Sequence, residues 1–147
     1  MTMRRLNLII LSLLLLACSD NRYDPKYDEK LWGIIKASNG GQIDISKIGI
    51  GAWTKVCFMG PYNTNTEKTL GFEWSGEYEK DLALLTSDGH NLIIFVTDSD
   101  VTDLIVQNRG YGDFWKLSGQ CLQRGNTNLV YEKSPVSSFV QAKSHNK

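Results

Sequence analysis

The chain has 147 residues with 16 basic and 16 acidic side chains, and 41% of its residues are hydrophobic while 22% are charged. This length supports one hydrophobic core, and the composition excludes disordered and fibrous classes of protein. A nucleic-acid binder needs an excess of basic residues to release counterions. Because this chain has no such excess, we expect no nucleic-acid partner.

The N-terminus has the pattern of an export signal. Arg4 and Arg5 precede an apolar run, Leu6 to Leu16, which ends at the small residue Ala17. A transmembrane helix needs roughly 20 apolar residues, so this run is too short to span a bilayer. A charged start, a short apolar centre and a small terminal residue predict a secretory signal peptide over residues 1–17.

The end of this segment, Leu15-Leu16-Ala17-Cys18, resembles the lipobox of bacterial lipoproteins. The resemblance implies cleavage before Cys18 and attachment of two or three acyl chains such as palmitate to that cysteine, enough for a stable lipid anchor. In enteric-type bacteria an aspartate after the cysteine retains the protein in the inner membrane, and here that position is Ser19. We therefore expect anchoring in the inner leaflet of the outer membrane, facing the periplasm.

Export also bears on Cys57 and Cys121, the two cysteines that remain. In an oxidising compartment an isolated pair favours a disulfide bond, although two buried reduced cysteines are the alternative. A bridge over this separation adds about 4 kcal/mol of stability in the chain-entropy description.

The ends of the mature chain are mostly polar. Residues 18–30 predict a lipidated tether, and a short helix beginning near Pro25 carries Leu31, Trp32, Ile34 and Ile35 on one side. Asn39-Gly40-Gly41 ends that helix, because these residues tolerate positive φ. Residues 134–147 predict a fraying polar tail, which leaves residues 31–133 as the single domain.

Within the domain, β-branched and aromatic runs between turn residues predict strands at Gln42–Ile45, Thr54–Met59, Asn91–Thr97, Val101–Gln107, Phe114–Leu122 and Leu129–Glu132. Asn91–Thr97 is apolar on both faces, as expected of a central strand. Short helices are predicted at Thr66–Leu70 and Tyr78–Leu85. The fold class is therefore α+β, a small antiparallel sheet of four to six strands with one or two short helices on one face.

Three segments of this domain are similar to an uncharacterised family of small bacterial envelope proteins. They are Trp53-Thr54-Lys55-Val56-Cys57-Phe58-Met59-Gly60-Pro61-Tyr62, Leu70-Gly71-Phe72-Glu73-Trp74 and Asp113-Phe114. The resemblance implies a recurrent domain and brings no catalytic residue with it.

Familiar site chemistries fit the chain poorly. A structural zinc site is excluded because only His90 and His145 accompany the cysteines. The acids of Asp98–Asp103 lack the spacing of a calcium loop, and no G-x-S-x-G turn is present to make a serine nucleophilic with His90. We therefore assign no catalytic residue, no metal ligand and no cofactor.

One charge asymmetry remains. Residues 67–113 hold ten acidic side chains against three basic ones, a net charge of −7, whereas residues 114–147 carry +4. Such a stretch is a solvated surface or an acidic face for a basic partner. The candidate partner-binding residues are Glu73, Trp74, Glu77, Tyr78, Glu79, Asp81 and Asp113.

These patterns favour a lipid-anchored module that binds a protein partner in the envelope, of the inhibitor, immunity or exclusion type, and that is not an enzyme. Acids beside aromatic residues also allow a small glycan hydrolase, because such enzymes place two carboxylates across the scissile bond. A structural subunit of an envelope assembly is the third possibility. A carboxylate pair in a walled cleft distinguishes the hydrolase from the binding module, which needs an exposed anchor surface.

Overall fold

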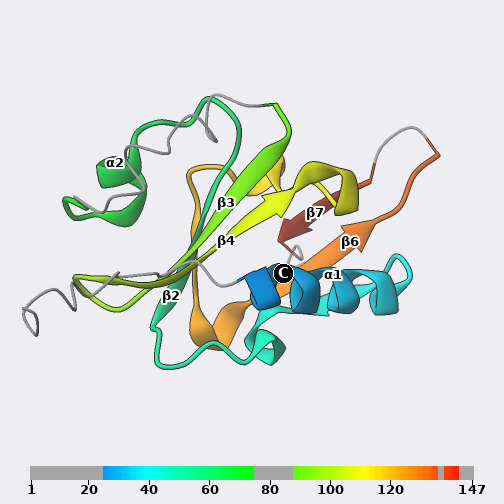
Figure 1. Cartoon of the computed structure of the whole chain (residues 1–147), viewed down its shortest axis with the longest axis horizontal. Coiled ribbons are helices and arrows are strands. Elements are labelled where there is room, and N and C mark those ends of the chain that lie inside the picture. The colour runs from blue at the N-terminus through cyan, green and yellow to red at the C-terminus, as the bar shows by residue number, and fades with distance from the viewer. Residues whose placement is uncertain (1–24, 75–87, 136–137, 143–147) are drawn as a thin grey trace, which may run out of the picture.

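The computed structural model describes residues 25–74, 88–135 and 138–142, and Figure 1 shows their arrangement. The α-helices are α1 (Pro25–Ser38) and α2 (Thr66–Leu70), and short 3-10 helices are η1 (Ile45–Ile48), η4 (Arg109–Tyr111), η5 (Trp115–Leu117) and η6 (Arg124–Asn126). The strands are β1 (Gln42–Asp44), β2 (Lys55–Met59), β3 (His90–Val96), β4 (Val101–Asn108), β5 (Cys121–Gln123), β6 (Asn128–Glu132) and β7 (Phe139–Ala142). The predicted α+β class is confirmed. The predicted helix Tyr78–Leu85 lies outside the described residues.

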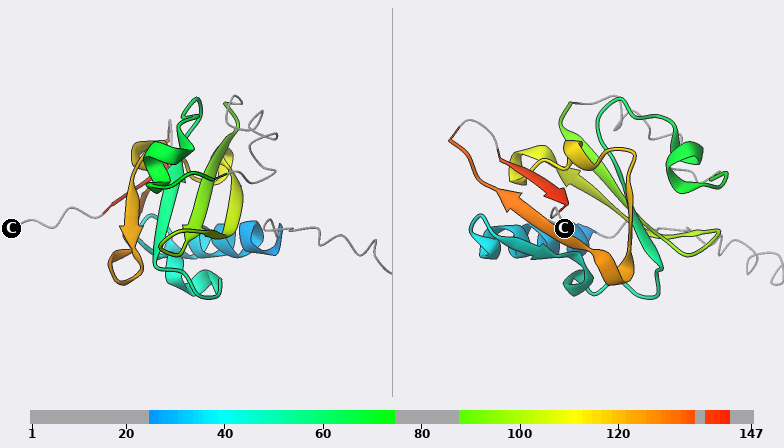
Figure 2. Two further views of the ribbon diagram at one scale, coloured as in Figure 1. Left: turned by 90° about the vertical axis from the view of Figure 1, so that its left-hand side faces the viewer. Right: turned by 180° about the vertical axis from the view of Figure 1, so that it is seen from behind.

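The strands are divided between two antiparallel sheets. The larger sheet has the order β4-β3-β2-β5 and the smaller has the order β1-β6-β7. Figure 2 shows β6 and β7 of the smaller sheet side by side in the view from behind. As the apolar run predicted, β3 is an internal strand, with every residue after His90 buried.

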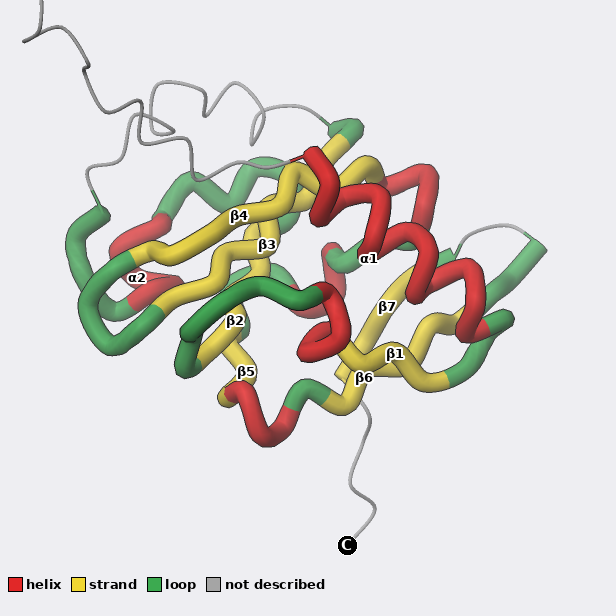
Figure 3. Tube along the Cα trace, turned by 60° about the horizontal axis from the view of Figure 1, so that its bottom comes forward, coloured by secondary structure: helices red, strands yellow, loops and turns green. Residues whose placement is uncertain are grey.

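The two faces of the larger sheet are buried against different layers. Because successive strand residues point to opposite faces, Val56 and Phe58 join Leu31 and Ile35 of α1 in the main core. The intervening residues Cys57 and Met59 pack with Leu70 of α2 and with Trp74. The helices therefore cover opposite faces of this sheet, contrary to the prediction of one face, and Figure 3 shows how far apart they lie.

The predicted disulfide bond is confirmed. Cys57 of β2 and Cys121 of β5 are directly opposite in the ladder, with Cα atoms 4.0 Å apart, and their sulfur atoms are bonded. Cys57 is fully buried and Cys121 packs against the same α2-side cluster. The bond joins the short edge strand β5 to the interior of the sheet.

The N-terminal boundary of the domain is earlier than predicted. Residues Pro25 to Lys30, the end of the predicted tether, form the first turns of α1, and the helix begins at Pro25 as predicted. Tyr27 packs against the main core, and the ammonium groups of Lys26 and Lys30 lie 4.8 and 5.6 Å from the centre of its ring. These contacts stabilise the polar start of the helix. The helix ends at Ser38, and Asn39 follows with φ 46°, in agreement with the prediction.

The C-terminal boundary is later than predicted. Phe139–Ala142, within the predicted fraying tail, form β7 and pair with β6. Val140 is completely buried, and its N–H donates to the carbonyl of Asp113 at 2.7 Å. The strand has only four residues, too few for a periodic signal in the sequence, and it is ordered by pairing with β6.

None of the helices in the described part of the chain is long and apolar enough to cross a membrane. The signal peptide, the lipobox and Cys18 lie outside the described residues.

Candidate functional site

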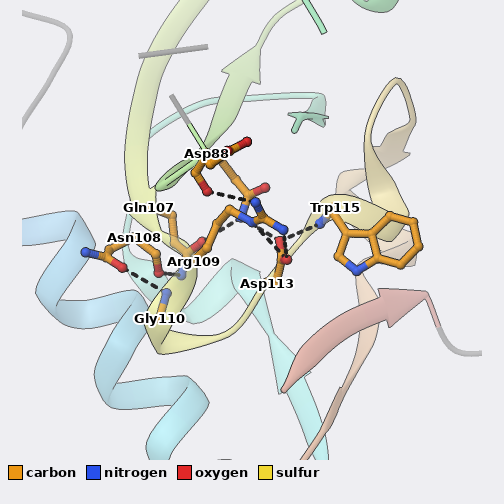
Figure 4. A network of polar contacts seen from close by, with 8 residues as sticks. Asp88, Gln107, Asn108, Arg109, Gly110, Asp113 and Trp115 are labelled. Carbon is orange, nitrogen blue, oxygen red and sulfur yellow. Dashed lines mark hydrogen bonds and ion pairs between the residues drawn. The ribbon is translucent and has the colours of Figure 1, made fainter. Parts of the chain in front are cut away.

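An ion pair between Arg109 and Asp113 forms the centre of a polar network at one end of β4 (Figure 4). The Asp113 Oδ2 atom accepts from Arg109 Nε at 2.9 Å and from Nη2 at 2.5 Å. The remaining terminal nitrogen, Nη1, donates to the carbonyl of Asp88 at 2.7 Å. The hydrogen bond to Asp113 raises the pKa of Arg109, so the guanidinium stays charged.

The other oxygen of Asp113 anchors the surrounding backbone and the interior. Its Oδ1 accepts from the Trp115 N–H at 3.0 Å and from Asn91 Nδ2 at 3.2 Å. The same Asn91 nitrogen donates to Gln107 Oε1 at 3.0 Å, and both amides are at least 96% buried. The exposed end of the network is thereby fixed to the buried ends of β3 and β4.

The backbone of the loop also depends on short polar links. Asn108 Oδ1 accepts from the Gly110 N–H at 2.8 Å, which closes the turn that becomes η4. Gly112 follows with φ 125°, a conformation that side-chain-bearing residues rarely adopt, and a Cβ there would lie 3.5 Å from Ile35. Asp113 then bridges to β7, since its N–H donates to the Ser138 carbonyl.

The segment after Asp113 contradicts the predicted strand Phe114–Leu122. Residues Trp115–Leu117 form η5, and only Cys121–Gln123 are extended. The bond from Asp113 Oδ1 to the Trp115 N–H favours a turn over a strand. With three residues per turn, Phe114 and Leu117 both point inward at 1% exposure, while Trp115 is 52% exposed.

The loop that contains Tyr62 is hydrogen-bonded to Ser118, the residue that follows η5. The hydroxyl oxygen of Ser118 accepts from the Gly60 N–H at 3.0 Å and from Asn63 Nδ2 at 3.2 Å. Between these two residues Tyr62 is 65% exposed and has φ 64°, which is strained for a bulky residue. Its hydroxyl is hydrogen-bonded to Asp88, and this bond is the main cause of a raised Tyr62 pKa.

Exposed aromatic side chains come from the loop segments next to the ion pair. Tyr62, Tyr111 and Trp115 are the large hydrophobic residues with the highest exposure in the described part of the chain. Tyr111 is in η4, two residues after Arg109, and Trp115 is two residues after Asp113. We call the five residues Tyr62, Arg109, Tyr111, Asp113 and Trp115 the Arg109 platform.

The predicted partner-binding residues do not form one surface in the described chain. Glu73 is exposed, but Trp74 is 5% exposed and belongs to the α2-side core. Both line a pocket of about 330 Å³ beside the start of α2. Asp113 is paired with Arg109, so it does not contribute an unpaired charge to an acidic face. Glu77, Tyr78, Glu79 and Asp81 lie outside the described residues.

Sequence reasoning missed Tyr62, Arg109 and Tyr111 as site residues, and it assigned Trp115 to a strand. The available signal was the density of turn residues in Asn108-Arg109-Gly110-Tyr111-Gly112-Asp113, because large side chains between glycines in a tight loop have little room to turn inward. Asp113 was predicted as an acidic partner-binding residue, and the structure pairs its carboxylate with Arg109.

In the residues that the structure describes, no group of three or more His, Cys, Asp or Glu side chains is arranged to hold a metal ion. His90 begins β3, and its Nδ1 atom is buried with no hydrogen-bond partner.

The loops as a whole offer exposed aromatic side chains beside a charged and hydrogen-bonded centre. Comparison of the chain with protein-family models, with curated proteins and with solved structures found no match in any of the three.

Proposed function

We propose that this protein is a periplasm-facing lipoprotein of the bacterial outer membrane that binds a protein partner as a protective or adaptor module of the inhibitor, immunity or exclusion type. The lipobox supports the cellular location, and the Arg109 platform supports the binding role. Cys18 is the lipid anchor in this proposal, and the platform is the contact surface.

The observation that carries the binding role is the presence of three exposed aromatic side chains in two joined loops, one of which contains Arg109. Trp, Tyr and Arg are the residues that most often dominate the energy of protein interfaces. Single exposed apolar residues are ordinary, but here Tyr62, Tyr111 and Trp115 belong to two loops that are joined by hydrogen bonds to Ser118.

The platform is also held in place before any partner arrives. Asp113 fixes Arg109 and the Trp115 backbone, while Ser118 ties the Tyr62 loop to η5. Surfaces that are ordered in the free protein lose less conformational entropy on binding. The strained φ of Tyr62 supports the same reading, because backbone strain is common at functional sites.

The acidic stretch takes a separate role in the proposal. The net charge of −7 over residues 67–113, which sums ten acidic and three basic side chains, attracts a basic partner to this protein. Charge at the rim of an interface changes the association rate more than the affinity. The anchors and the steering charges are therefore separable by mutation.

The test compares variants of the tagged full-length lipoprotein captured from detergent-solubilised envelopes. Replacing Tyr62 and Trp115 with alanine removes two anchors, and each such truncation commonly costs about 2 kcal/mol of binding energy, or roughly 30-fold in affinity. The matched control replaces two exposed residues outside the platform and outside the acidic side chains, Lys47 and Ser99. We expect the partner to be recovered with wild type and the control and lost with the double variant. Equal recovery from all three would contradict the proposal.

A further inference from the structure

A pocket of about 220 Å³ lies beside the Arg109 platform, between α1 and the end of β4. Its lining includes Trp32 of α1, Val106 and Gln107 of β4, and Tyr111 of η4. Typical small-molecule sites enclose roughly 300–1,000 Å³, so this space suits one side chain better than a whole cofactor. Tyr111 belongs both to the pocket and to the platform.

The pocket wall is aromatic. The rings of Trp32 and Tyr111 are stacked with their centres 4.6 Å apart and their planes at 25°. Trp32 is half-buried and Tyr111 is 49% exposed, so the stacked pair is partly open to solvent. Aromatic faces attract cations, and they also bind the methylene stems of long charged side chains.

The charge of the pocket is negative. Asp28 and Glu29, in the first turns of α1, are both part of the lining. The nearest lysines of the same helix, Lys26 and Lys30, do not line the pocket and have their ammonium groups over Tyr27. Two carboxylates beside aromatic rings favour a cation and repel an anion.

The side-chain amide of Gln107, which also lines the pocket, already has hydrogen-bond partners. Its Oε1 accepts from Asn91, and its Nε2 donates to the Asn108 carbonyl at 2.5 Å. The other polar side chains of the lining are Asn108 and the carboxylates of Asp28 and Glu29, and only the carboxylates carry charge. Lysine and arginine side chains have an apolar stem and a cationic head. A pocket with aromatic walls and carboxylates in its lining fits both parts.

We infer that this pocket receives a basic side chain, lysine or arginine, of the protein partner that the platform binds. The inference rests on the proposed function for its biological setting. The cation site itself depends only on the pocket residues, so it is testable without the partner.

The experiment titrates full-length protein in detergent micelles with N-acetyl-lysine amide and N-acetyl-arginine amide, and follows the indole N–H signals by NMR. The protein has four tryptophans, and the Trp32 signal is identified by its loss in Trp32→Phe. N-acetyl-norleucine amide, which has a similar stem without the charge, is the matched probe. We expect saturable shifts of the Trp32 signal by both basic probes, with dissociation constants on the order of 1 mM, and at least fivefold weaker binding of the norleucine probe.

Glu29→Gln should weaken the basic probes severalfold and leave the norleucine probe unchanged, whereas Asp98→Asn in the exposed β3–β4 turn should change neither. Equal shifts by the neutral probe, or no saturable shift of Trp32, would overturn the inference. A negative result in the probe titration would not affect the outcome of the capture experiment with the Tyr62 and Trp115 variants. Probe binding without any captured partner would overturn the proposed function alone.

Discussion

Asp113 shows how much one carboxylate does in this protein. It accepts from the Arg109 guanidinium, the Asn91 amide and the Trp115 N–H, and its backbone pairs with β7. The side chain is 15% exposed and that of Arg109 is 30% exposed, so solvent compensates little for the loss of either partner. Removal of the carboxylate therefore leaves a partly buried guanidinium and two unsatisfied donors.

Asp113→Ala should lower the free energy of unfolding by about 2–3 kcal/mol, because an unpaired, partly buried charge and the lost bonds add to the cost. Asp113→Asn should cost less, since one amide oxygen still accepts from neighbouring donors. Asp98→Ala, in an exposed turn, should change stability by less than about 0.5 kcal/mol. Urea denaturation of the three variants measures these values, and a loss at Asp113 no larger than that at Asp98 would show that the network is not structural.

At the scale of elements, the disulfide joins β5 to the sheet that supports the platform. Replacing both Cys57 and Cys121 with alanine should lower the free energy of unfolding by up to about 4 kcal/mol, since the bond closes a separation of 64 residues. Denaturation of the double variant and of the reduced wild type measures the loss. Two thiols that react with alkylating agent in the folded, unreduced protein would contradict the bond.

The elements also show where sequence patterns are sufficient. The β3 and β4 strands, α1 and α2 were predictable because their periodicity and their caps are local. The η5 turn was not, because one side-chain bond from Asp113 outweighed the period-two pattern. The β7 strand was not predictable either, since its pairing with β6 supplies an order that its own residues do not encode.

The candidate site was also only partly predictable from the sequence. The sequence marked Asp113 and a region rich in acids and aromatics, but exposure depends on which residues the fold turns inward. Trp74 and Trp115 look equivalent in sequence, yet Trp74 is 5% exposed and Trp115 is 52% exposed. The difference comes from packing against the α2 side of the sheet and from the three-residue period of η5.

At the scale of the whole molecule, the proposal joins a membrane address at one end of the chain to a binding surface on the folded domain. Cys18→Ser should abolish both signal cleavage at that site and the lipid mass shift, because the proposal makes the Cys18 sulfur the attachment atom of the lipid. Metabolic labelling with palmitate and mass spectrometry check this. Label that persists in the variant would place the lipid elsewhere.

The most direct test of the central claim is photo-crosslinking in intact envelopes from the position of Trp115. A photoreactive phenylalanine at residue 115 keeps an aromatic ring on the platform, and the same residue at position 98 provides the control in an exposed turn. The proposal predicts a light-dependent adduct of one discrete mass from position 115, suppressed by excess untagged wild type, and no such adduct from position 98. No adduct from position 115, or the same adducts from both positions, would contradict a partner-binding platform around Arg109.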